Sequence, residues 1–291
     1  MKIRYMAVLA GLVSHNTFIY AANDDQSLAW KPAIEFEYDN FQSSRFDNSR
    51  GELSLDVAKF KISNRYISVD YQHWNVDTKN IAELPFGDQQ SKPIKQLESF
   101  NISTGYMARI NPNWRWLNTL GLGVNYEKQI NDATSVNLLS LGFYSLNPDL
   151  DIIAGFSYRY HPVQSRILPA VGLSYRANEF EGWSATLGFP RSFVNYGFAA
   201  DWQVSAGLAY QRILAKLAKD SVIEADGYVE ISNWQTDVRL IHRPAPAWEV
   251  FASLRYIPFY EFETYNQRGN RQDTYDLEPT VGAGLGVRYQ F

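Results

Sequence analysis

The twelve residues from Thr280 to Phe291 read TVGAGLGVRYQF. One parity is apolar or aromatic, with Val281, Ala283, Leu285, Val287, Tyr289 and Phe291. The other parity holds glycine and polar residues, with Gly282, Gly284, Gly286, Arg288 and Gln290. This alternation predicts a β-strand with one apolar face and one wet face. Terminal residues usually fray unless a sheet holds them, so we expect this last strand to pair with the first and close the sheet.

The same alternation recurs through most of the chain. It is seen at 34–39, 53–57, 67–72, 100–110, 120–126, 152–158, 171–175, 183–189, 204–210 and 250–256. Spacing typical of a helix is rare, and its one candidate is RILAKLAKD at 212–220, which is short enough to be a loop helix or a strand extension. The sequence therefore predicts an all-β protein.

The connections between these segments alternate in length. Short turns rich in Asn, Pro, Asp and Gly follow near positions 64, 111, 147, 177, 199 and 243. Long connections lie between them, at 42–50, 77–96, 128–134, 161–166, 212–227 and 261–276. Outer-membrane barrels show this asymmetry, with short periplasmic turns and long outer loops. The tight connection at Pro190 and Arg191 breaks the pattern.

We predict a single antiparallel transmembrane up-and-down β-barrel of about 14 strands. This count treats 228–242 as one strand with a bulge near Asn233. The alternative is about 12 strands, if the brief strands around Pro190 fold out of the wall. A soluble β-sandwich also alternates, but it gives no reason for short and long connections in strict succession.

Composition narrows the class further. The 291 residues contain no cysteine, which excludes disulfides and thiolate metal sites. The net charge is -4 and no long basic run occurs, so nucleic acid is a poor candidate as a partner. The mean hydropathy of -0.32 fits a membrane barrel as well as a soluble protein, because alternation keeps the average low. Nothing in the sequence points to a cofactor.

The first residues resemble a secretory signal peptide. Lys2 and Arg4 precede a short apolar run, and small residues follow at Ala21 and Ala22. We therefore expect a signal peptide at 1–21, cleaved near 21/22, and a barrel domain at 22–291. No later apolar run reaches about 18 residues, the length that a transmembrane helix needs.

The final aromatic residues, Tyr289 and Phe291, resemble the end signature by which bacterial outer-membrane proteins are recognised for assembly. Together with the signal peptide they predict a location in the bacterial outer membrane. The partners expected there are outer-membrane lipid, lipopolysaccharide and the barrel-assembly machinery. If the barrel is a pore, small solutes are further expected partners.

A central segment carries a family resemblance. Leu168 and Pro169, LSYR ending at Arg176, GFPR at 188–191 and TDVRL around Arg239 are similar to uncharacterised bacterial outer-membrane barrels grouped as a domain of unknown function. The similarity covers mainly 167–256. Because that family has no assigned activity, the resemblance implies fold and location and supplies no catalytic residue.

The wet parity predicts the lining of the lumen. Early strands supply acids, namely Glu35, Glu37, Asp39, Asp56 and Asp70. Later strands supply bases, namely Arg109, Arg159, Arg176, Arg239, Arg255 and Arg288. If these sectors stay apart, their transverse field would select small polar or charged solutes in a porin-like passive channel. If they meet as salt bridges, the barrel is closed and serves a structural or interaction role.

Catalytic and metal sites find little support. His161 with Ser165, or His73 with an inward serine, could form a Ser-His pair at the rim of a lipid hydrolase or acyltransferase, but no nucleophile motif accompanies them. The acidic stretch at 23–26 lacks the spacing of a metal loop. We therefore predict no enzyme and no metal. The connection at 77–96 is expected to be a mobile surface loop, an outer lid or an inward constriction.

Overall fold

The computed structural model describes residues 32–176 and 181–291. The expected signal peptide and the acidic stretch at 23–26 lie outside these residues. The strands are β1 (Ala33–Arg45), β2 (Glu52–Ser63), β3 (Ile67–Lys79), β4 (Gln96–Asn111), β5 (Trp114–Tyr126), β6 (Thr134–Asn147), β7 (Leu150–Tyr160), β8 (Arg166–Arg176), β9 (Gly182–Phe189), β10 (Arg191–Ala199), β11 (Trp202–Lys216), β12 (Tyr228–Ala245), β13 (Trp248–Tyr265), β14 (Arg271–Leu277) and β15 (Thr280–Gln290). A short 3-10 helix, η1, spans Ile81–Glu83.

The sheet closes on itself through its last strand. Strand β15 pairs antiparallel with β1 on one side and with β13 on the other, so Leu285 lies opposite both Tyr38 and Ala252. Each other wall strand pairs with its sequence neighbours. Fourteen strands, β1 to β13 and β15, form the ring, which confirms the predicted barrel.

Strand β14 is the outer continuation of β15. It pairs with the last residues of β13, Tyr260 to Tyr265, whereas β15 pairs with β13 only as far as Ile257. Glu278 and Pro279, between β14 and β15, do not pair with β13. Proline is tolerated at such a position because no N–H is needed there for the ladder. One wall strand is thus broken into two pieces.

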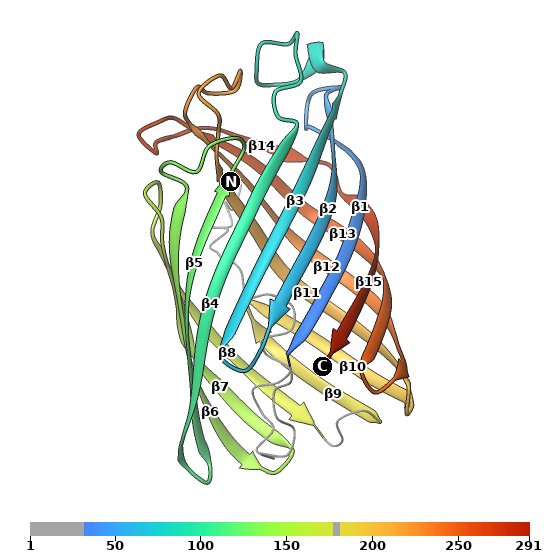
Figure 1. Cartoon of the computed structure of the whole chain (residues 1–291). Helices are drawn as coiled ribbons and strands as arrows, with labels where there is room; N and C mark the ends of the chain where they lie inside the picture. Colours follow the sequence, from blue (N-terminus) through green and yellow to red (C-terminus); the bar gives the residue numbers. More distant parts are fainter. Residues whose placement is uncertain (1–31, 177–180) are drawn as a thin grey trace, which may run out of the picture.

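The two ends of the barrel differ as predicted. Short turns join the strands at the end where the chain enters β1 and leaves β15, and long connections project from the other end (Figure 1). We call these the short-turn end and the long-loop end. Phe291 N–H donates to Pro32 O over 2.9 Å, which places both ends of the described barrel at the short-turn end.

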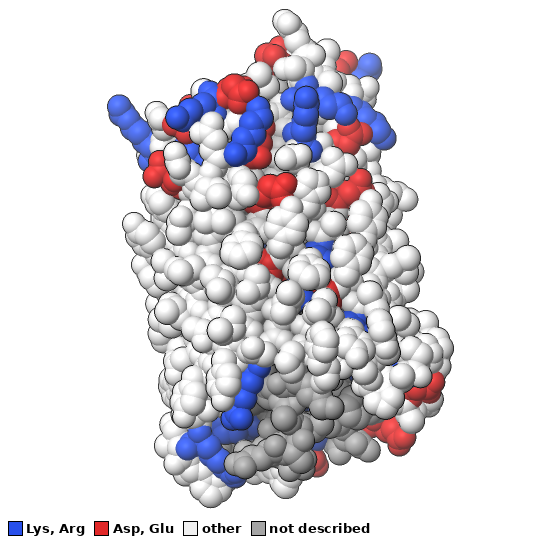
Figure 2. All heavy atoms as spheres, in the orientation of Figure 1, with Lys and Arg blue, Asp and Glu red and all other residues white. Residues whose placement is uncertain are grey.

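The outer surface is apolar across its middle. Exposed outward side chains include Leu254 at 70% and Leu285 at 67%. In Figure 2 charged residues gather at the two ends of the molecule, and uncharged atoms cover most of the belt between them. A belt of this kind is what a membrane-spanning barrel presents to lipid. The protein is a transmembrane β-barrel of the outer-membrane type.

The described residues contain no helix that is both long enough and apolar enough to cross a membrane.

On one side of the barrel the wall strands stop short of the long-loop end. Strand β9 pairs with β8 only between Val171 and Arg176, and β10 begins opposite Ala209 of β11. Above that level β11 leaves the wall line, and Lys216 pairs in parallel with Tyr126 of β5, a strand from across the sheet order. The outer half of the β11–β12 hairpin therefore crosses the lumen instead of standing in the wall.

Two sequence expectations meet this hairpin. The 212–220 segment is a strand extension as far as Lys216, not a helix. The β12 strand is continuous, and its pairing with β13 shifts between Trp234 and Thr236, close to the predicted bulge. The additional residue lies on β13, at Ile257 and Pro258, because β13 has the longer run across the shift.

Candidate functional site in the barrel lumen

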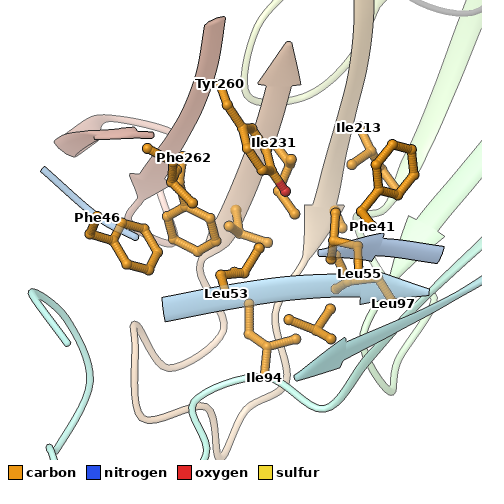
Figure 3. Close-up of a cluster of buried hydrophobic side chains, with 14 of the residues drawn as sticks. Phe41, Phe46, Leu53, Leu55, Ile94, Leu97, Ile213, Ile231, Tyr260 and Phe262 are labelled. Atoms are coloured by element: carbon orange, nitrogen blue, oxygen red, sulfur yellow. The ribbon is translucent and has the colours of Figure 1, made fainter. Parts of the chain in front are cut away.

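The long-loop half of the lumen is filled by an apolar cluster, which we call the apolar plug. Its members come from β1 to β4, the 80–95 connection, β11 to β14 and the residues that directly follow β1 and β11, and those labelled in Figure 3 point toward one another. Ile213 and Ile231 supply the hairpin's share, and Phe262 stacks on Phe86 at 4.7 Å between ring centroids. Leu53 and Leu97 are 2% and 0% exposed. This half of the barrel has a packed interior.

The 80–95 connection is part of this plug. Leu84, Phe86 and Ile94 are buried in it, and Tyr275 on β14 donates to Pro85 O over 3.1 Å. The connection therefore folds inward, as one of the sequence alternatives held, and the expectation of a mobile surface loop is wrong for these residues.

The plug also overturns the predicted parity of β2. Leu53, Leu55 and Val57 face the lumen, and Asp56 faces outward, where it accepts from Asn40 over 2.5 Å. Parity cannot change within a regular strand, and further down the same face carries Lys59, which must reach Asp39 inside. Asp56 is therefore not a lumen residue.

Below the plug lies an ion-pair cluster, formed by Glu37, Asp39, Lys59, Arg239 and Arg255. Arg239 Nη2 donates to Glu37 Oε1 over 3.0 Å, and Lys59 Nζ lies 2.8 Å from Asp39 Oδ2. Arg255 contacts both carboxylates. Four of the five residues are more than nine-tenths buried, and the fifth, Lys59, is the most exposed to solvent.

Of the two sequence alternatives for these charges, separate sectors or ion pairs, this cluster shows ion pairs. The acids of β1 pair with the arginines of β12 and β13 and do not stand apart from them. The reason is the closure, because only β15 stands between β1 and β13, and its facing residue there is Gly284. A side chain at Gly284 would meet Asp39 and Arg255, so the glycine leaves room for the pairing across it.

A small cavity adjoins the cluster. Its volume is about 80 Å³, room for a few water molecules. Its lining combines polar side chains, including Lys61, Asp70, Gln72, Gln211 and Gln235, with apolar ones from the plug, and three members of the ion-pair cluster, Glu37, Asp39 and Lys59, border it. The lumen at this level is narrow and charged.

The remaining predicted lining residues are spread toward the short-turn end. Glu35 lies opposite both Arg288 and Lys61 in the ladder, and Asp70 lies opposite Lys61 on the next strand. Gln72 also donates to Asp70 over 2.9 Å.

Arg109 and Arg176 sit at the short-turn end, near the ends of β4 and β8. Arg109 lies opposite Arg115 in the ladder. They therefore join neither the ion-pair cluster nor the cavity.

Arg159 belongs to a different place, on the other side of the crossing hairpin. It lies across the ladder from Arg166, and Arg166 Nη1 is 4.0 Å from Glu230 Oε1 on the hairpin. Arg212 pairs with the same carboxylate and donates to Gln164 over 3.0 Å. We call Arg159, His161, Arg166, Arg212 and Glu230 the arginine cluster.

Sequence reasoning missed several inward residues. On β5 to β8 the inner face carries an apolar patch of Leu117, Leu139, Leu141, Phe143, Ile153 and Ala170. It also carries a buried pair, in which Arg115 Nη2 donates to Asp151 over 2.6 Å. The parity of Arg115 and Asp151 could have revealed this pair, but the apolar patch contradicts the rule that the lumen parity is wet.

The histidines do not form the predicted rim pairs. His73 points outward and lies 2.8 Å from Glu98, so pairing with an inward serine is wrong. His161 Nδ1 accepts from Val163 N–H over 3.2 Å, while Ser165 is exposed. Burial, reinforced by Arg159 and Arg212, lowers the pKa of His161 to about 3.

The terminal aromatics pack on the short-turn rim. Tyr289 lies 4.8 Å from Trp248 and 4.9 Å from Phe291 between ring centroids. Their role as an assembly signal stays a prediction.

Comparisons with known proteins give barrels of similar outline. No family model and no curated protein matches the chain. Among solved structures, the KdgM porin has a TM-score of 0.38 at 10% identity, covering 89% of this chain and 99% of its own. The NanC porin has 0.40 at 6%, covering 89% and 100%. The Acinetobacter baumannii outer membrane protein Omp33 has 0.34 at 10%, covering 91% and 99%. The strand pairing, not these likenesses, establishes the barrel.

Proposed function

We propose that the protein is a passive, porin-like diffusion channel of the bacterial outer membrane for small polar or charged solutes. The ion-pair cluster and the cavity beside it carry this proposal. A barrel of about eight strands is filled by its own side chains, whereas larger barrels enclose a lumen. Here fourteen strands surround charged groups at a constriction, and such groups set which solutes pass.

The described arrangement is the closed or narrowest state of this channel. The β11–β12 hairpin and the apolar plug fill the long-loop half, so a solute passes only when the hairpin moves. Above Ala209 the β11 side of the hairpin has lost its β10 neighbour and meets β5 through Lys216 and hydrogen bonds from Asn125 and Glu127. The β12 side stays paired with β13 as far as Tyr228, so movement of the hairpin would turn about that ladder. We infer that the hairpin is the constricting element.

Single-channel recording in a planar bilayer tests the channel. We expect intermittent small openings, because a solute passes only when the hairpin moves. Their selectivity should shift toward anions in Glu37→Gln, which leaves Asp39 as the one carboxylate of the cluster beside Lys59, Arg239 and Arg255. Asp56→Asn is the matched control, since that carboxylate faces outward and its loss leaves selectivity unchanged.

A closed structural barrel is the second candidate, and the burial of both faces of the hairpin favours it. Silence across repeated insertions, with heat-modifiable migration on a gel proving a folded barrel, would replace the channel by this candidate.

Export and assembly complete the proposal. We propose cleavage near 21/22, insertion by the barrel-assembly machinery through Tyr289 and Phe291, and contact with lipid and lipopolysaccharide. Kinship with the uncharacterised barrels is likewise proposed, on the segment 167–256. N-terminal sequencing of the mature chain checks the cleavage, and deleting Phe291 checks assembly.

A further inference from the structure

The arginine cluster holds donors that find no acceptor. Arg159 is 6% exposed, and its Nε, Nη1 and Nη2 have no hydrogen-bond partner among the described residues. A buried guanidinium without a partner costs much more than a paired one, and buried polar groups in native proteins are almost always satisfied. An unpartnered buried arginine therefore needs an explanation.

His161 adds another donor on the same face of the chain. It is 2% exposed, and its Nδ1 accepts a hydrogen bond from Val163 N–H. The neutral ring then carries its proton on Nε2, which also lacks a partner among the described residues. Every unpartnered group that we find in this cluster is thus a donor.

The charges of the cluster do not balance. Arg159, Arg166 and Arg212 bring three positive charges, and Glu230 brings one negative charge. Among the nearby ions, Lys216 pairs with Asp226 and Arg271 pairs with Glu263, while Glu261 adds one more carboxylate close to Glu230. The three guanidiniums still outnumber the two carboxylates, in a place that is largely shut off from water.

We propose that the arginine cluster is a binding site for an oxyanion, a phosphate or carboxylate group held by Arg159 and His161. Such a group accepts several charge-assisted hydrogen bonds and suits the guanidinium fork. The site lies on the opposite face of the hairpin from the apolar plug. It goes beyond the proposed channel and holds whether or not the barrel conducts.

Two sources could supply the oxyanion. One is a soluble solute in the lumen. The other is a lipid head group, because the wall is low at the cluster: Arg166 lies above the last β8–β9 pairing and Arg212 lies above the start of β10. Both sources present the same chemistry to Arg159.

The test measures phosphate binding to the full chain in detergent, by titration calorimetry at fixed ionic strength. We expect binding by the wild type and a loss of about tenfold or more in Arg159→Met, since charge-assisted hydrogen bonds disappear. Arg159→Lys should retain part of the affinity. Arg268→Gln, which removes an exposed arginine near the same end, is the matched control and should bind like the wild type. Heat-modifiable migration verifies folding of each variant.

A second arm separates the sources. The wild type and Arg159→Met are compared in phosphatidylcholine nanodiscs with and without phosphatidylglycerol. If the occupant is a lipid head group, phosphatidylglycerol raises the unfolding temperature of the wild type alone and blocks phosphate. If it is a soluble solute, phosphatidylglycerol changes nothing and phosphate binds in both discs. An equal response of the two proteins to phosphate and to phosphatidylglycerol overturns the site.

Discussion

The two faces of the β11–β12 hairpin lie inside the same barrel and are built in opposite ways. One face presents Ile213 and Ile231 to the apolar plug, and the other presents Arg212 and Glu230 to the arginine cluster. In a wall strand such alternation separates lipid from lumen. Here both sides are interior, so alternation instead divides the long-loop half into a dry region and a charged region.

Placing a charge on the apolar face should have the largest effect. Ile231→Asp buries a carboxylate without a partner, and it should cost more than Phe262→Ala, which leaves a cavity worth about 3–5 kcal/mol. Urea unfolding in vesicles, followed by tryptophan fluorescence, measures the loss. Val222→Asp, in the exposed loop of the same hairpin, is the control and should change little. Equal losses at both positions would mean that the hairpin does not pack inside.

Breaking the ion pair on the charged face should come next. Glu230→Gln leaves Arg212 buried without its carboxylate, which typically costs about 3–5 kcal/mol. Replacing both residues by methionine should cost much less, because Arg212 is then no longer a buried charge without its carboxylate. The same unfolding assay applies. A double variant as unstable as Glu230→Gln would contradict this reading of the face.

Acid should weaken the charged face through His161. Its folded pKa of about 3 lies below the ordinary value of about 6.5, so protonation favours the unfolded chain. The stability that neutral His161 allows is complete above pH 6.5 and falls as the pH drops toward 3. We expect His161→Gln to unfold with a weaker pH dependence between about 6.5 and 4.5, where carboxylates remain largely ionised. Parallel profiles would refute it.

The smallest effect belongs to an ion pair outside the barrel. Lys128 Nζ lies 2.8 Å from Asp220 in the loops, and both side chains are exposed. Solvent and salt screen such pairs. Lys128→Gln should therefore leave the unfolding curve unchanged within error, and a clear loss would show that the loop contact anchors the hairpin.

The sequence predicted the wall better than the lumen. Alternation and loop lengths are local signals, and the last strand, Thr280–Gln290, shows how they fix the barrel and its closure. Whether Asp56 faces the lumen or the lipid could not be predicted in this way. Lys59 and Lys61, further along β2, lie opposite the inward acids of β1 and share the parity of Leu53, so Asp56 faces outward. The inward course of the hairpin follows from the shortness of β9 and β10, and the only sequence signal for it was the tight turn at Pro190.

Arg159 is buried, in a neighbourhood that the sequence did not predict. Parity says that a side chain points inward, yet it does not say that a hairpin divides the interior. Two of the charged neighbours of Arg159, Arg212 and Glu230, come from the hairpin, a segment far from Arg159 in the sequence. Such contacts are set by tertiary packing, which periodicity does not report.

One measurement tests most directly that the hairpin closes the lumen. Tyr210 and Trp234 face each other across it, so residues 211–233 can be replaced by a two-residue turn that joins them. Single-channel recordings of this variant and the wild type should show a conductance several-fold higher in the variant, since the crossing element is gone. Equal conductance in the two proteins, or silence in both once folding is verified, would contradict the account.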